Sequence, residues 1–201
     1  SLIALYEAMK LLECEGGDPY KIYELGSAAP FTILTIAGSA RQAGVLFQEI
    51  RNKLLSSPYF RDKFISDGLK QDSIFLCTPQ DRRNNEELRK KGLSEFPGSI
   101  EIRSGHSNSN TLVGISCFVL LFDEVGTFKQ TGGSSSGEQL YGNLSPTVAT
   151  YVRKEFIIDP KTKLPAVDKE GKPLEPKRYY DGKIISISSP RGMDGIFWKL
   201  Y

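Results

Sequence analysis

Short apolar runs alternate along the chain with segments whose apolar residues recur at every third or fourth position. Runs rich in branched aliphatic residues predict strands that are buried on both faces. Recurrence at the helical period predicts helices with one apolar face. The runs that predict strands are FTILTIA at 31–37, SIFLC at 73–77, CFVLLF at 117–122 and KIISIS at 183–188.

Helices are predicted in the stretches between these strands. Ser39, with Gln42 three residues later, has the pattern of a capping box, and the pair Thr78-Pro79 favours the start of another helix. Gly92 ends that second helix, which is charged on nearly all sides. The predicted helices cover 1–12, 43–54, 81–91, 136–153 and 192–201, and a brief alternating strand covers 99–103.

This alternation of strands and helices predicts the α/β class, with a mostly parallel sheet flanked by helices. The 201 residues are enough for one buried core and few for two, so we expect a single domain over 1–201. The segment 159–178 stands apart, because it is rich in Pro, Lys, Asp and Glu and contains turn signals. We expect it to be an exposed hairpin or loop inserted into that domain.

The composition is that of a soluble globular domain, with 39% hydrophobic and 25% charged residues. No apolar run approaches the roughly 18 residues of a membrane span, and the first residues lack the features of a signal peptide. The net charge of +2 neither requires nor excludes a nucleic-acid partner. Three widely spaced cysteines favour free thiols in a reducing compartment, and the single histidine, His106, argues against a histidine-based metal site or triad.

The apolar run at 118–122 is followed directly by Asp123 and Glu124. In an open α/β sheet, ligands bind at the carboxyl ends of the strands, so both carboxylates should project to that edge. This is the pattern of a Walker B motif, in which the first acid holds Mg²⁺ and the second polarises the attacking water. The alternative is a strand that simply ends at a polar turn.

A second predicted strand ends in polar residues, because 184–187 is followed by Ser188, Ser189 and Pro190. If this strand lies beside that of Asp123, the two hydroxyls reach the same edge and can sense a γ-phosphate by hydrogen bonding. The alternative is an ordinary turn and helix cap, which serine and proline also favour.

Other polar clusters are weaker signals. The segment 104–114 is interpreted as a loop, in which His106 is either a candidate base at the catalytic edge or a solvated side chain. Arg41 and Gln42 open a helix whose amino end can hold an anion, although helix initiation alone explains them. Basic pairs such as Arg82-Arg83 are interleaved with acids, which favours a solvated surface.

In their order and spacing, these segments resemble the ATPase domain of terminase large subunits, the DNA-packaging motors of tailed phages. The resemblance covers nearly the whole chain, with 159–178 excepted. The segments that carry it are SLIALYEAMKLLE after the phosphate loop, GSARQAGVLF at a strand-to-helix turn, VLLFDE as the Walker B strand, and ISISSPRG as the coupling motif.

The resemblance implies a P-loop NTPase fold with an additional strand between the P-loop strand and the Walker B strand. It implies that Asp123 holds Mg²⁺ and that Glu124 is the catalytic carboxylate, and it matches Ser188 and Ser189 to the coupling motif. The implied activity is Mg²⁺-dependent hydrolysis of ATP that drives double-stranded DNA into a procapsid in the host cell cytoplasm. The implied partners are the DNA, the portal protein, the terminase small subunit and further copies of the chain on the portal.

Two departures from the family pattern change this expectation. No G-x-x-x-x-G-K-[ST] sequence occurs in the 201 residues, so we expect an ATPase core that is truncated at both ends, lacks the nuclease domain and is inactive by itself. Where many family members have Leu-Arg-Gly, this chain has Leu112-Val113-Gly114. An arginine finger must then come from elsewhere, with Arg103 and Arg191 as candidates.

Two other interpretations stay open. A helicase-like ATPase shares the apolar strand followed by Asp and Glu, and a second helicase core beyond Tyr201 would identify it. A non-enzymatic α/β interaction module would fail to bind Mg·ATP even with an intact phosphate loop.

Overall fold

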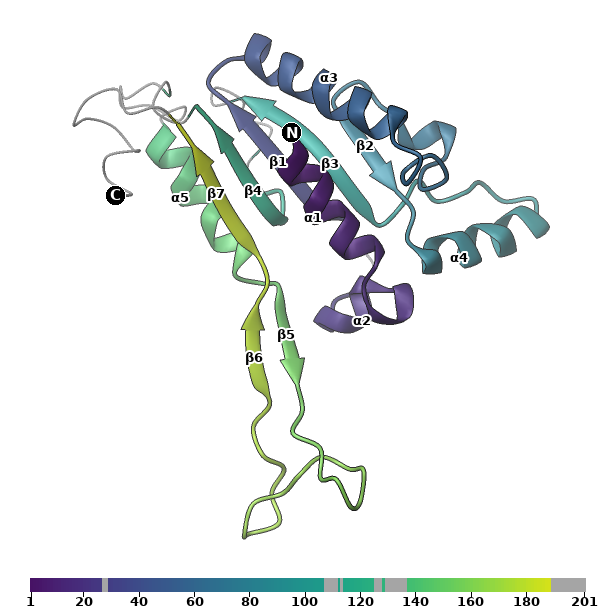
Figure 1. Cartoon of the computed structure of the whole chain (residues 1–201), viewed down its shortest axis with the longest axis vertical. Helices are drawn as coiled ribbons and strands as arrows, with labels where there is room; N and C mark the ends of the chain where they lie inside the picture. The colour runs from purple at the N-terminus through teal and green to yellow at the C-terminus, as the bar shows by residue number, and fades with distance from the viewer. Residues whose placement is uncertain (27–28, 107–111, 113, 125–127, 129–136, 189–201) are drawn as a thin grey trace.

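The computed structural model describes residues 1–26, 29–106, 112, 114–124, 128 and 137–188. Within them, five strands form one sheet in the order β2-β3-β1-β4-β7 (Figure 1). Strands β1, β3, β4 and β7 run parallel, and β2 is antiparallel to β3. Their bounds are β1 Phe31–Ala37, β2 Ser73–Leu76, β3 Ile100–His106, β4 Cys117–Asp123 and β7 Lys183–Ile187. This confirms the predicted α/β class with a mostly parallel sheet flanked by helices.

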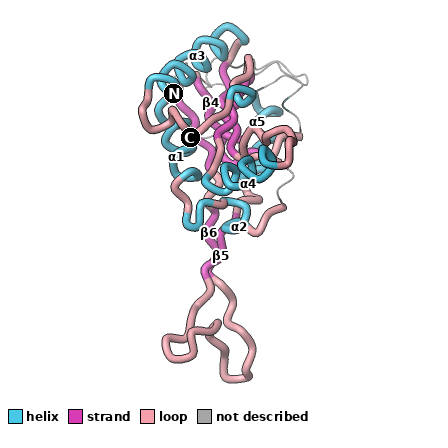
Figure 2. The backbone as a smooth tube through the Cα atoms, turned by 90° about the vertical axis from the view of Figure 1, so that its right-hand side faces the viewer, coloured by secondary structure: helices cyan, strands magenta, loops and turns pink. Residues whose placement is uncertain are grey.

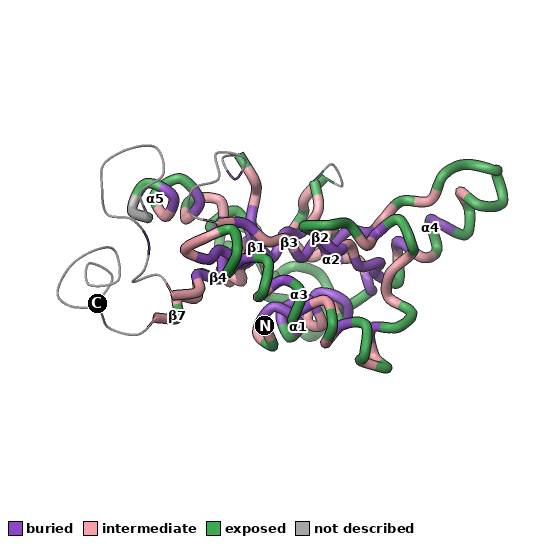
Figure 3. The backbone as a smooth tube through the Cα atoms, turned by 90° about the horizontal axis from the view of Figure 1, so that it is seen from above, coloured by how far each residue is buried: buried purple, intermediate pink, exposed green. Residues whose placement is uncertain are grey.

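Helices cover both faces of the sheet. Figure 3 shows α5 on one side of the strands and α1 and α3 on the other. The helices are α1 Leu2–Leu12, α2 Pro19–Tyr23, α3 Ala40–Ser56, α4 Pro79–Lys90 and α5 Gly137–Val148, with short 3-10 turns at Glu15–Gly17 and Ser66–Gly68.

Each face of the sheet has its own apolar core. Because alternate residues of a strand point to opposite faces, Ile33 and Val119 belong to the cluster with α1 and α3, and Leu34 and Leu120 belong to the cluster with α5. All of β1 is buried, as its continuous apolar run predicts. The central strands β1 and β4 are therefore held by packing on both sides, which fixes where their polar ends lie.

Local capping signals set two of the helix starts. The Ser39 hydroxyl accepts a hydrogen bond from the Gln42 backbone N–H at 3.3 Å, as the sequence pattern predicts. Thr78 and Asp81 form a complete capping box, in which each side chain accepts from the other residue's backbone N–H, at 3.1 and 2.8 Å. Gly92 follows α4 with a φ of 68°, a left-handed conformation that favours glycine.

A two-stranded ribbon projects from the body of the molecule, away from the helices that cover the sheet (Figures 1 and 2). It consists of β5 Val152–Glu155 and β6 Lys177–Tyr180, paired antiparallel. Between them the chain folds into turns in which Asp159 accepts from the Lys161 N–H and Asp168 from the Lys172 N–H, at 2.7 and 2.9 Å. We call residues 152–180 the arm.

Some predicted boundaries are wrong. Residues 104–106, predicted to open a loop, belong to β3, because their backbone pairs with residues 35–37 of β1. Arg153, predicted to be helical, lies in β5 opposite Tyr179. Helix α2 was not predicted, and the helix expected over 192–201 lies outside the described residues. In the described part of the chain, no helix combines the length and apolar character needed to cross a membrane.

Candidate active site

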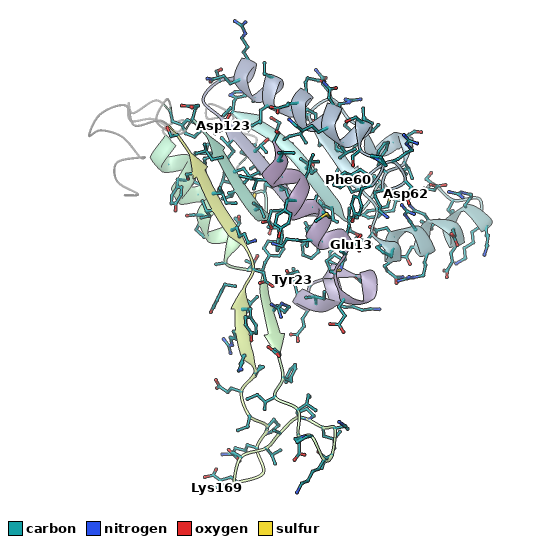
Figure 4. All side chains as sticks on the ribbon, in the orientation of Figure 1. Glu13, Tyr23, Phe60, Asp62, Asp123 and Lys169 are labelled. Atoms are coloured by element: carbon teal, nitrogen blue, oxygen red, sulfur yellow. The ribbon has the colours of Figure 1, made fainter. Side chains whose placement is uncertain are left out.

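Asp123 is the last residue of β4, at the edge of the sheet where the parallel strands end (Figure 4). The neighbouring strand is β7, and its register sets Asp123 directly beside Ile187. Because Ser188 follows Ile187 and Glu124 follows Asp123, three of the predicted site residues meet at one part of the edge. The fourth, Ser189, lies outside the described residues.

The carboxyl group of Asp123 lies in surroundings that disfavour its charge. Burial raises the pKa of Asp123, and the neighbouring charge of Glu124 raises it further. Adjacent carboxylates keep their charge more readily when a cation lies beside them. The pair is therefore suited to a divalent ion.

Glu124 has an uncommon backbone conformation, with a φ of 53°. Only a few per cent of residues other than glycine adopt this left-handed region. The chain bends at Glu124, directly after the last residue of β4. Such strained residues concentrate at functional sites, where a side chain must be aimed in a particular direction.

Ser1 holds the amino end of α1 against α3. The Ser1 hydroxyl donates a hydrogen bond to Glu49 of α3 at 2.9 Å, and the Lys53 ammonium donates to the Ser1 oxygen at 3.2 Å.

The residues present fit a magnesium ion that is shared with a phosphate group. Mg²⁺ in proteins typically takes one or two carboxylates and completes its shell with water and phosphate oxygens. Asp123 can supply such a carboxylate. Within the described ranges, no group of three His, Cys, Asp or Glu side chains forms a site that the protein alone would close around a metal.

Other residues predicted from the sequence lie elsewhere. Arg103 is on β3, two strands from β4 in the sheet order, and its guanidinium lies 3.9 Å from the carboxylate of Glu101. His106 ends the same strand. Val113 and Arg191 lie outside the described residues. The basic side chains of α4 pair with acids, as expected for a solvated surface: Arg82 with Asp62 at 2.9 Å and Arg89 with Glu95 at 2.7 Å.

Sequence reasoning missed Glu7 and Lys183, which connect α1 to β7. Glu7 is only 3% exposed, and its two oxygens accept hydrogen bonds from the Lys183 ammonium at 2.9 and 3.2 Å. A third bond comes from Lys10 at 2.7 Å. The available signal was the position of Glu7 on the apolar face of α1, between the buried residues Ala4 and Leu11.

A family model described as "Uncharacterized protein MJ0330, N-terminal P-loop domain" matches residues 1–158. No curated protein and no solved structure matches the chain. The description names a P-loop domain, a class of nucleotide-binding domains, and says nothing of terminases or DNA packaging.

Proposed function

Since this chain belongs to the family of the N-terminal P-loop domain of uncharacterized protein MJ0330, we propose that it supplies the hydrolytic edge of a Mg²⁺-dependent ATPase. The observation that carries this proposal is the register of β4 and β7, which sets Asp123 beside Ile187 and so groups both acids with Ser188. Nucleotides bind at the carboxyl edge of such sheets.

In the proposed reaction, water attacks the γ-phosphorus of ATP, the bond from phosphorus to the bridging oxygen of ADP breaks, and ADP and phosphate leave. Glu124 orients the water and accepts its proton. Asp123 would hold Mg²⁺, which neutralises charge on the phosphate oxygens when bound. The Ser188 hydroxyl donates a hydrogen bond toward the γ-phosphate, so that the state of the nucleotide is felt at the end of β7.

We further propose that hydrolysis drives double-stranded DNA into a procapsid, as in terminase large subunits. The support is the order of VLLFDE and ISISSPRG in the sequence, together with the direct pairing of β4, which contains most of the first motif, with β7, which contains the start of the second. A helicase-like motor could use the same two strands, and ISISSPRG favours packaging over it. By the same resemblance, the portal protein, the terminase small subunit and further copies of the chain are proposed partners in the host cytoplasm.

Hydrolysis is tested by comparing Glu124→Gln with Glu24→Gln. The 201 residues contain no G-x-x-x-x-G-K-[ST] sequence, so the measurement uses the product of the complete reading frame. We expect Glu124→Gln to lower steady-state ATP turnover by at least about 100-fold, with little change in Mg·ATP affinity measured by calorimetry. Glu24 shares the φ of 53° but lies at the end of α2, so its variant should keep full turnover.

Two results would count against these proposals. Normal turnover in Glu124→Gln would remove Glu124 from the mechanism. An active ATPase that fails to displace a third strand from triplex DNA would keep the hydrolytic role and contradict the DNA motor.

A further inference from the structure

A cavity of about 490 Å³ lies between the first turns of α3 and the carboxyl end of β3. Its lining includes Ala40 and Gly44 from α3, and Arg103, Ser104 and His106 from β3. A volume of several hundred cubic ångströms is typical of sites for small organic ligands. The cavity is therefore larger than a single water or ion requires.

The cavity lies on the same edge of the sheet as the candidate active site, but apart from it. His106 pairs with Ala37 at the end of β1, and β1 lies between β3 and β4 in the sheet. With about 4.8 Å between neighbouring strands, the end of β3 is roughly 10 Å from the end of β4. The proposed hydrolysis makes no use of this region.

His106 lines the cavity with part of its ring. Its Nδ1 atom is buried from solvent, so a ligand in the cavity would contact the rest of the imidazole. The neighbouring Ser104 hydroxyl already donates to the Ala43 carbonyl oxygen at 3.1 Å.

The α3 side of the cavity is built from small residues. Gly44 stands inside a long helix, where glycine is less favourable than alanine. A Cβ atom at Gly44 would meet no other atom within 4 Å, so packing within the chain does not require glycine there. Gly44 instead leaves open space beside Ala40 and Ala43.

The described lining holds one basic and one acidic residue, Arg103 and Asp72. Arg103 contributes a guanidinium, which is suited to binding phosphate oxygens, and the first turn of α3 holds no acidic residue. Asp72 is the acidic residue among the described lining, and it is exposed at the rim. Glu101, beside Arg103, is buried outside the cavity lining.

We propose that this cavity binds a phosphate group through Arg103, with His106 in its wall, and that the phosphate belongs to a nucleic-acid backbone or to a free nucleotide. Both sources carry the same phosphodiester or phosphate oxygens, and the space beside Gly44 accepts the sugar attached to them. The site is separate from the edge of β4 and β7, so it does not depend on the proposed hydrolysis.

The chain offers a direct readout, because His106 is its single histidine. In protein labelled with ¹⁵N-histidine, one set of imidazole signals reports on the cavity. We expect these signals to shift and saturate when a short DNA duplex or ATP is added to the 201-residue chain. Saturation by duplex at lower concentration than by ATP or inorganic phosphate assigns the site to a nucleic-acid backbone, and the reverse order assigns it to a nucleotide.

Variants separate a built site from general charge attraction. Gly44→Leu should fill the cavity and weaken binding at least tenfold, and Arg103→Gln should do the same. Gly142→Leu is the matched control, since Gly142 is an exposed glycine of α5 that also has no atom near its Cβ position. Arg83→Gln, on α4, is the control for lost charge. Both controls should bind as the parent chain does.

The proposal is overturned if none of the three probes shifts the His106 signals. It is also overturned if Gly44→Leu and Arg103→Gln, shown to be folded by thermal unfolding, bind as tightly as their controls. The His106 signals report binding without any turnover. If Glu124→Gln abolishes hydrolysis but the His106 signals still shift when the probe is added, this site is separate from the hydrolytic one.

Discussion

At the scale of single residues, Glu124 and Glu24 share one backbone conformation for different reasons. Both have a φ of 53°. Glu24 caps the end of α2, where a left-handed residue is common. Glu124 follows a strand, so no helix end explains its conformation. A left-handed residue with a side chain costs about 1–2 kcal/mol relative to its ordinary conformation.

We therefore predict that glycine at position 124 removes a backbone cost of about 1 kcal/mol, because glycine adopts this conformation without steric cost, and that Glu124→Gly is stabilised by this amount less the contribution of the Glu124 side chain. Glu24→Gly should give a similar gain, less the contribution of its ion pair with Lys154. Urea unfolding of both variants tests this. A loss of stability in Glu124→Gly would mean that its side chain holds the fold together rather than serving a site.

At the scale of elements, the buried Glu7 joins α1 to β7. Lys183 at the start of β7 binds Glu7 near the middle of α1, whereas the other end of β7 lies beside Asp123. Burial by itself would raise the pKa of Glu7, but the bonds from Lys10 and Lys183 outweigh it and lower the pKa. A charged, fully paired carboxylate is thus built into the contact between helix and strand.

Removing the charge of Glu7 leaves Lys10 and Lys183 without their acid, but both side chains are partly exposed and stay hydrated. We predict that Glu7→Gln lowers the free energy of unfolding by about 1–3 kcal/mol at pH 7. Glu49→Gln removes an acid from an exposed pair with Lys53 and should change stability little. Urea unfolding at pH 7 gives the comparison, and equal effects of the two substitutions would contradict it.

The lowered pKa of Glu7 also fixes the sign of a pH effect. The stabilising contribution is present above the unfolded-state pKa near 4.5 and is lost as the pH falls through the lower folded-state pKa. Stability of the parent chain should therefore fall more steeply below about pH 4.5 than stability of Glu7→Gln. If the free energy of unfolding falls equally with pH in the parent chain and in Glu7→Gln below about pH 4.5, Glu7 is not ionised in the fold.

Local patterns predicted the elements that depend on local physics. Strand β1 appeared with its observed bounds because all its residues are buried, and the Ser39 cap was readable because it acts over three residues. Residues 104–106 were predicted as loop because their side chains are polar, yet their backbone completes a ladder with β1. Arg153 pairs with Tyr179, a partner that no short window of sequence contains.

The candidate site divides in the same way. Asp123 and Glu124 were readable because an apolar strand ends directly before them. That Ser188 lies beside them depends on β7 pairing with β4, which is a contact between segments some sixty residues apart in the sequence. The sequence pattern left this pairing as a condition, because neither segment by itself shows which strand it pairs with. The cavity beside His106 was hidden because the residue was expected in a loop rather than at the end of β3.

At the scale of the whole molecule, the arm is joined to the body through its base. Asp181 accepts hydrogen bonds from Tyr23 of α2 at 3.2 Å and from Arg153 of β5 at 3.0 Å. Figure 4 shows Tyr23 at this base and Lys169 at the far end of the arm. The outer part carries exposed apolar side chains, namely Phe156, Ile157, Ile158, Leu164 and Val167. The hydrogen bonds of Asp181 at the base should therefore hold the arm in place.

We predict that the outer arm can be removed without loss of the fold. Glu155 and Lys177 lie directly opposite each other, so replacing 156–176 with Asn-Gly closes β5 and β6 with a two-residue turn. The unfolding temperature should change by less than about 4 °C, which corresponds to roughly 1 kcal/mol in a protein of this size. Asp181→Ala, which breaks the base, should cost about 2 kcal/mol. If the shortened chain unfolds at a much lower temperature than Asp181→Ala, the outer arm is part of the fold. If the shortened chain unfolds within about 4 °C of the parent chain, the exposed apolar side chains of the outer arm are not needed for folding.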